Sequence, residues 1–294
     1  MNKRVAPAYL GVILIWSTTP LAIQWSGLGA DFVTPLLARM VIGLLLCAAL
    51  IASLRISLPY HRTALQAYAA AGLGIFGAML LVYWGARYVP SGLIAVLFGL
   101  VPLFTGVIGL LFEHDDRLTP GKLLGILMGL AGLIVIFGAG THISTQAMPA
   151  FAAILAAVMI QSISLVMVKR IGATMPAIAL TTGAMLLIVA LLLPLWWLLF
   201  GHMPAWTYKA ALSTLYLGIF GSVVGFTLYF YITKHLQAGQ VALITLITPV
   251  TALLLGQWLN QEQINLDIWL GTALILLGLG VHQWQQINLI SRVK

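Results

Sequence analysis

Charged side chains are scarce in this sequence. Of its 294 residues, 7% are Asp, Glu, Lys or Arg and 62% are hydrophobic, whereas a typical soluble domain carries about 25% charged residues. This shortage excludes an ordinary water-soluble fold. The formal net charge of +8 would suit nucleic acid, but the cations stand singly or in pairs between apolar runs and form no basic patch. Anionic lipid headgroups are therefore the expected partner, and nucleic acid is not.

Cysteine and catalytic motifs are also missing. The single cysteine, Cys47, excludes an internal disulfide and a thiolate metal cluster. The sequence contains no HExxH, GxSxG or Walker motif and no paired carboxylates within an apolar run, and its six histidines lie too far apart to indicate a metal site. The chain is therefore not expected to be an enzyme, and no metal or cofactor is predicted.

Ten apolar runs are long enough to cross a bilayer as helices, which takes about 20 residues each. Lys3 and Arg4 precede the first run as in a signal peptide, but the run is long and lacks a clear cleavage site, so we expect it to be retained. The predicted spans cover residues 5–25, 32–54, 66–84, 91–112, 120–139, 148–168, 175–200, 209–233, 238–258 and 267–286.

The cations are distributed unevenly between the two sides of these spans. Ten spans put both termini on one side. The loops of that side hold eleven Lys and Arg residues, against two, Arg87 and Lys209, on the other. Because cytoplasmic loops carry the excess of Lys and Arg, we predict a multi-pass protein of the inner membrane with both termini in the cytoplasm.

The sequence contains a long internal repeat. Three pairs of segments match in the same order, at offsets of 144, 147 and 146 residues, which indicates a duplicated unit. We assign the two copies to residues 5–139 and 148–286, each with five spans. Because five is odd, the second copy must enter the membrane from the opposite face. The predicted fold is therefore an all-α membrane protein of ten transmembrane helices in two inverted five-helix repeats, which is typical of secondary transporters. The matching segments are LGIFG at 73–77 and 217–221, RYVPSGLIAVLFGLVP at 87–102 and KHLQAGQVALITLITP at 234–249, and LLGILMGLAG at 123–132 and WLGTALILLG at 269–278.

Pro102 and Pro249 lie at matching positions in the middle of the fourth and ninth spans. A proline removes one backbone donor and clashes with the carbonyl four residues earlier, so each is expected to kink its helix. We predict a hinge at both positions. A static kink is the alternative, because proline is common in membrane helices.

Arg39 is the one cation well inside a predicted span, and no Asp or Glu lies at mid-depth, since Glu113 and Glu262 are expected at cytoplasmic helix ends. An arginine within the membrane is costly and usually faces water or a partner. Arg39 is therefore expected either to reach the surface or backbone carbonyls, or to bind a substrate carboxylate or phosphate through two hydrogen bonds. Other polar and aromatic residues within the spans are predicted to line the substrate path: Trp16, Ser17, Gln24, Tyr83, Trp84, Gln161, Tyr229 and Thr245.

The chain resembles the drug/metabolite transporter superfamily, in its ten-span group built from two EamA-type repeats. The resemblance covers nearly the whole chain and is most specific over residues 217–280, with a glycine-rich eighth span, a proline in the ninth, a Gly-Glu-like element and a glycine-spaced tenth. Gln261 stands before Glu262 where the family pattern has glycine, Asp116 occupies the equivalent place in the first half, and Arg39 matches an arginine that such proteins often carry. The resemblance implies export of small metabolites, often amino acids or related compounds.

The predicted function is transport of small carboxylate-bearing solutes, amino acids first, by alternating access around a central cavity. A cationic substrate is not expected, because the spans offer no carboxylate at mid-depth to hold it. The alternatives are a sugar-phosphate or nucleotide-sugar exchanger, and a non-transporting membrane protein. The expected partners are a small-molecule solute and the lipid bilayer, and a monomer is left open as the assembly state.

Overall fold

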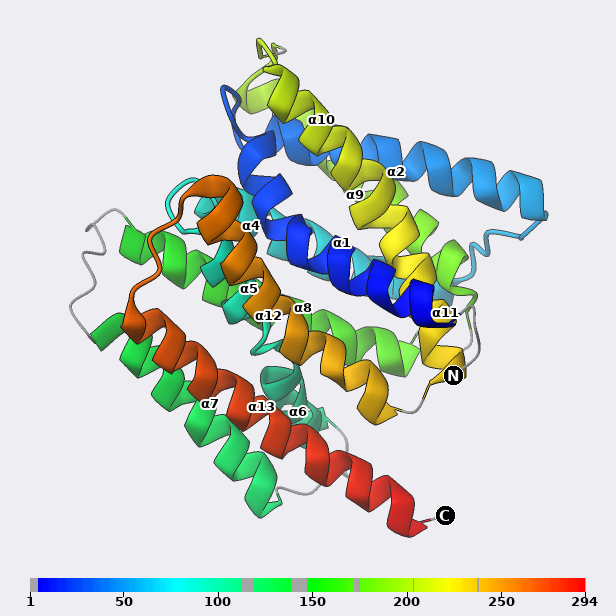
Figure 1. Cartoon of the computed structure of the whole chain (residues 1–294). Coiled ribbons are helices and arrows are strands. Elements are labelled where there is room, and N and C mark those ends of the chain that lie inside the picture. Colours follow the sequence, from blue (N-terminus) through cyan, green and yellow to red (C-terminus); the bar gives the residue numbers. More distant parts are fainter. Residues whose placement is uncertain are drawn as a thin grey trace.

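The computed structural model describes residues 5–112, 119–138, 147–171, 175–202, 204–236 and 238–293 (Figure 1). Within these residues, ten helical stretches are long and apolar enough to cross a membrane, which confirms the predicted number. The expectations for Glu113 and Asp116 fall outside the described residues. The helices are α1 (Val5–Ser26), α2 (Val33–Leu54), α3 (Arg62–Leu73), η1 (Gly74–Ala78), α4 (Met79–Gly85), α5 (Ser91–Phe98), α6 (Val101–Phe112), α7 (Pro120–Gly138), α8 (Ala147–Ile171), α9 (Ala177–Leu199), α10 (Tyr208–Tyr216), η2 (Leu217–Val224), α11 (Gly225–His235), α12 (Ala238–Asn260) and α13 (Leu266–Val293).

The third and eighth spans each contain a π-helical segment. The third span runs through α3, η1 and α4, and the eighth through α10, η2 and α11. Both π-helical segments fall on the duplicated LGIFG sequence, η1 over Gly74–Ala78 and η2 over Leu217–Val224. The internal repeat is thus visible in the backbone, and it places the wider helical turn, which is frequent at functional sites, at equivalent points of the two halves.

The two intramembrane prolines behave differently. The fourth span is interrupted between α5 and α6 at Gly99 and Leu100, so that Pro102 becomes the second residue of a new helix. Proline is tolerated there because the first turn of a helix needs no intrahelical N–H donor. In contrast, α12 continues through Pro249 as a single helix.

The two halves of the chain pack in equivalent ways. The main helix contacts are matched by contacts between the corresponding spans, which lie five spans apart in the sequence. The pairs α2 with α9, α5 with α12, and α7 with α13 each join one helix to its own counterpart, while the packing of α1 on α11 is matched by that of α8 on α4. The start of α1 and the end of α13 lie on the same side of the bundle (Figure 1). This arrangement confirms the fold of two inverted five-helix repeats.

Helices α7 and α13 approach each other through four glycines. A Cβ added to Gly125 would lie 2.6 Å from the carbonyl oxygen of Gly278, and one added to Gly278 would lie 2.6 Å from that of Gly125. Gly132 and Gly271 make the equivalent reciprocal contact, at 2.5 and 2.6 Å. Small residues let membrane helices approach at backbone distance, so these glycines fix the fifth span against the tenth.

Candidate functional site

Arg39 is buried where α2 of the first half meets η2 of the second. Its side chain is only 6% exposed, although it lies inside a transmembrane helix. Its Nε donates a 3.0 Å hydrogen bond to Oγ of Ser222, and that hydroxyl donates in turn to the carbonyl oxygen of Leu217, five residues earlier. This five-residue spacing is that of a π-helix, so the π-helical segment η2 orients the acceptor of Arg39.

The guanidinium of Arg39 is not fully satisfied by the protein. Within the described residues its Nη1 is buried and has no hydrogen-bond partner. Its Nη2 lies next to Gly221, 3.4 Å from the position that a Cβ would take there. Oγ1 of Thr19 is 3.8 Å from the same position. An unpaired buried polar group is costly. The arrangement is therefore suited to an additional acceptor, such as an anionic group of a ligand.

Helix α1 supplies aromatic and hydroxyl contacts to the second half. The ring of Trp16 lies 4.9 Å from that of Tyr229, between centroids, and its Nε1 lies 3.6 Å from a Cβ placed on Gly225. Ser17 shares a short hydrogen bond with Thr251 of α12. Trp16 therefore packs on Tyr229 next to Gly225, one turn after the Gly221 that neighbours Arg39, whereas Ser17 is directed towards α12.

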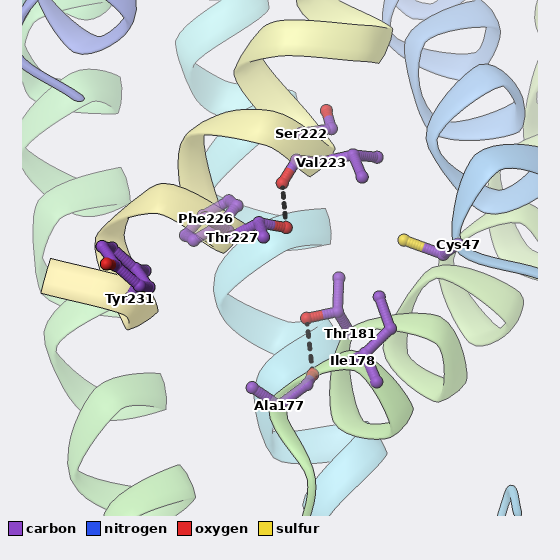
Figure 2. A pocket seen from close by; sticks show the side chains of 9 residues that line it. All are labelled: Cys47, Ala177, Ile178, Thr181, Ser222, Val223, Phe226, Thr227 and Tyr231. Carbon is purple, nitrogen blue, oxygen red and sulfur yellow. Dashed lines mark hydrogen bonds between the residues drawn. The ribbon is translucent and has the colours of Figure 1, made fainter. Parts of the chain in front are cut away.

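A cavity of about 270 Å³ lies between α2, α9 and α11 (Figure 2). Ser222, the partner of Arg39, lies at one end of the lining, about midway along the eighth span, and Tyr231 lies one turn before the end of that span. Cys47 of α2 is 1% exposed, and its sulfur points towards the other lining side chains, among them Thr181 and Phe226. The cavity therefore extends from mid-depth towards the side that carries the chain termini.

The predicted residues on the third and sixth spans lie elsewhere, and of these Gln161 contacts η1. Oε1 of Gln161 lies 3.2 Å from a Cβ placed on Gly74, and Oγ of Ser164 donates a 2.8 Å hydrogen bond to the carbonyl oxygen of Ala70. Tyr83 is 3% exposed, and its hydroxyl has no partner among the described residues. Trp84 packs on the ring of Tyr88, with 5.7 Å between centroids. None of these side chains lines the cavity between α2, α9 and α11.

Gln24 belongs to a polar cluster at the end of the bundle opposite the termini, which we call the outer polar cluster (Gln24, Trp25, Ser91, Asn260 and Glu262). Asn260 donates to Oε1 of Gln24 at 2.8 Å and to Glu262 at 3.1 Å, and it accepts from Nε1 of Trp25 at 2.9 Å. The cluster joins the end of α1 and the start of α5 to the end of α12. It therefore binds the two halves together at this end.

Glu262 caps α5 at the end of the bundle opposite the termini, whereas the sequence led us to expect both Glu262 and the termini on the cytoplasmic side. Its carboxylate accepts hydrogen bonds from the backbone N–H and hydroxyl of Ser91, at 2.9 and 2.7 Å, and from the N–H of Gly92 at 3.2 Å. A carboxylate at a helix N-terminus is stabilised by the free N–H groups and the helix dipole. The expectation is wrong because the loop between the ninth and tenth spans lies on the same side as the loop between the third and fourth.

Thr245 is directed towards the tenth span, where its hydroxyl accepts a 3.1 Å hydrogen bond from Nε2 of Gln283. The structure thus divides the predicted residues among several places and does not gather them in one cavity. Ser222 and Asn260 are the residues that the sequence analysis missed. Ser222 follows the repeated LGIFG directly, and Asn260 is the polar end of the ninth span, which are the signals that could have identified them. Among the described residues no group of three or more His, Cys, Asp or Glu is placed to hold a metal ion.

Several known proteins are similar to this chain. The uncharacterized transporter YoaV of Bacillus subtilis strain 168 is 29% identical over 289 residues, covering 94% of this chain and 95% of YoaV. The uncharacterized inner membrane transporter YedA of Escherichia coli strain K12 is 29% identical over 289 residues, covering 92% and 87%. A probable terminal-alkyne amino-acid exporter of Streptantibioticus cattleyicolor is 27% identical over 191 residues, covering 64% of this chain and 63% of the exporter.

The fold and the family are shown by two further similarities. A solved crystal structure has the same fold, with a TM-score of 0.66 and 24% identity, and the match covers 98% of this chain and 99% of the other. The sequence pattern of the EamA-like transporter family matches residues 5–138 and 148–282, and the chain therefore belongs to this family of membrane transporters.

Proposed function

We propose that this membrane transporter exports small carboxylate-bearing solutes, amino acids first, across the inner membrane. The observation that carries the proposal is the buried guanidinium of Arg39, whose Nη1 lacks a partner among the described residues. A substrate carboxylate would accept two parallel hydrogen bonds from such a group. The aromatic pair Trp16 and Tyr229, which packs between the first and eighth spans, is proposed to line the path of the solute.

The proposed mechanism is alternating access between the two halves, which comprise residues 5–139 and 148–286, with both termini in the cytoplasm. The outer polar cluster joins the halves at the end opposite the termini, which supports a conformation closed on that side. Pro102 and Pro249 are proposed as the hinges. The interruption of the fourth span just before Pro102 supports this role more directly than the continuous helix at Pro249 does.

Export of amino acids is supported by the name of one relative, the probable terminal-alkyne amino-acid exporter, which is 27% identical over 191 residues. Arg39 would also suit a phosphate, so a sugar phosphate is the competing substrate class. A phosphate monoester carries up to two charges at neutral pH, and Arg39 supplies one. This difference favours the carboxylate.

The test compares an amino acid with its methyl ester in proteoliposomes containing the wild type or Arg39→Gln. A hydrogen bond to a charged group contributes about 1.5–3 kcal/mol, so the wild type should prefer the free acid by about ten- to a hundredfold. Arg39→Gln should lose that preference, because its amide does not discriminate an acid from an ester by charge.

Arg55→Gln is the matched control. It makes the same substitution at the other end of α2, where Arg55 is exposed, and it should keep the wild-type preference. If the wild type moves the ester as fast as the acid, or Arg39→Gln discriminates as before, the carboxylate assignment is refuted. A hexose phosphate that outcompetes every amino acid would favour the competing class.

A further inference from the structure

We propose that the cavity between α2, α9 and α11 holds the aliphatic side chain of an amino-acid substrate whose carboxylate displaces Ser222 from Arg39. This inference rests on the proposed function and adds the side-chain class of the substrate and the residue that it replaces. Ser222 links the cavity to Arg39, because it is one of the lining residues and its hydroxyl accepts a 3.0 Å hydrogen bond from Nε of Arg39. A solute with its carboxylate on Arg39 would therefore have its side chain in this cavity.

The cavity walls select for an apolar group. Ile178, Val223 and Phe226 contribute hydrocarbon. The two threonines of the lining use their hydroxyl protons within their own helices, since Thr181 donates to the carbonyl oxygen of Ala177 at 2.9 Å and Thr227 to that of Val223 at 2.8 Å (Figure 2). They therefore offer little to a polar side chain. A volume of about 270 Å³ lies just below the roughly 300–1,000 Å³ of drug-sized sites, which suits a small aliphatic chain.

Ser222 acts as the internal substitute for the substrate. Its hydroxyl is a neutral acceptor for Nε of Arg39 while it donates to the carbonyl oxygen of Leu217. Hydrogen bonds to an ionised acceptor are roughly twice as strong as those to a neutral one, so a carboxylate would compete successfully for the guanidinium. Its second oxygen would accept from Nη2, which lies on the same side of the guanidinium as the Nε–H bond. No charge would then remain unpaired at mid-depth when substrate is bound.

Cys47 provides the readout, because it is the one cysteine in the sequence and its sulfur faces the cavity (Figure 2). Wild-type proteoliposomes are treated with N-ethylmaleimide alone, with leucine or with glycine. At a hundred times Kd about 1% of sites remain empty, so leucine should slow modification of Cys47 by at least about tenfold. Glycine reaches Arg39 but leaves the cavity empty, so it should not protect.

A pair of variants on α9 tests the same cavity through transport. Thr181→Leu adds a larger side chain to the lining, whereas Leu187→Phe enlarges a side chain that is 37% exposed elsewhere on the helix. One methylene in an apolar pocket changes selectivity by about 10–200-fold, so Thr181→Leu should lower the ratio of leucine to glycine transport by at least about tenfold. Leu187→Phe should leave the ratio unchanged. Arg39-dependent preference for the acid over the ester, measured in both variants, shows that the protein is folded.

Three results would overturn the inference while leaving the proposed function intact. The first is equal protection of Cys47 by leucine and by glycine, and the second is an unchanged ratio of leucine to glycine transport in Thr181→Leu. The third is modification of Cys47 in detergent but not in lipid, which would show that a lipid acyl chain fills the cavity. If no carboxylate is transported at all, the proposed function fails and this inference fails with it.

Discussion

Replacing Gly278 with alanine should destabilise the protein, whereas the same change at Gly280 should not. The two glycines lie two residues apart on α13. A Cβ on Gly278 would lie 2.6 Å from the carbonyl oxygen of Gly125 and 2.8 Å from Cβ of Met128, whereas nothing lies within 4 Å of a Cβ on Gly280. The first contact involves backbone, so α7 and α13 must move apart to relieve it.

The magnitude follows from two opposing terms. Overpacking costs about 1–3 kcal/mol, and alanine is favoured over glycine in a helix by roughly 1 kcal/mol. Gly280→Ala causes no overpacking, so only the helix preference of alanine affects its stability. The two variants should therefore differ by about 1–3 kcal/mol, which corresponds to a difference in Tm of roughly 2–12 °C at the 2–4 °C per kcal/mol of domains of 150–250 residues.

The assay is thermal unfolding of both variants in the same mild detergent, followed by tryptophan fluorescence. Membrane proteins often unfold irreversibly, so one scan rate is used throughout. If Gly278→Ala melts at or above Gly280→Ala, the helices do not depend on glycine for their approach, and the reasoning is refuted.

Three other predictions follow from the backbone and the loops. Gln261 has φ of 53°, in the left-handed region that costs an L-residue about 1–2 kcal/mol, so Gln261→Gly should raise Tm, whereas Gln263→Gly should not. In a cysteine-free variant, Gln263→Cys should react with an impermeant maleimide on intact cells, and Ser57→Cys only after permeabilisation, because the two exposed loops lie on opposite sides; the reverse would refute cytoplasmic termini. If Pro102 and Pro249 act as hinges, Pro→Ala at either should slow transport more than it weakens substrate binding, and the interrupted span of Pro102 should give the larger effect; unchanged rates would reduce both prolines to static features.

The spans and the duplication could be predicted from the sequence because both are one-dimensional signals. Apolar length sets the crossing of a bilayer, and LGIFG occurs twice. That Arg39 needs water or a partner also followed from the cost of its charge. Its partner Ser222 did not, because the hydroxyl is aimed by a π-helical turn that no helical periodicity indicates.

Polar residues within the spans were harder to interpret. The sequence shows that Gln24 and Thr245 need partners, but it does not say which, and the structure provides Asn260 for the first and Gln283 for the second. Gln261 stands where the family pattern has glycine. Its φ lies in the left-handed region, which glycine adopts without strain, and this is the physical reason for the glycine in the pattern. Such partnerships and dihedral angles depend on tertiary contacts, which pattern alone does not specify.

The glycine contacts between α7 and α13 have a consequence for the origin of the chain. In the repeat, Gly125 corresponds to Gly271 and Gly132 corresponds to Gly278. Gly125 contacts Gly278, and Gly132 contacts Gly271. In a C2 homodimer, if residue i of one subunit contacts residue j of the other, then j of the first contacts i of the second, and such an interface is called isologous. The two glycine pairs follow this rule. The fused halves thus retain the self-complementary surface with which two separate, oppositely inserted copies of one five-helix protein would associate.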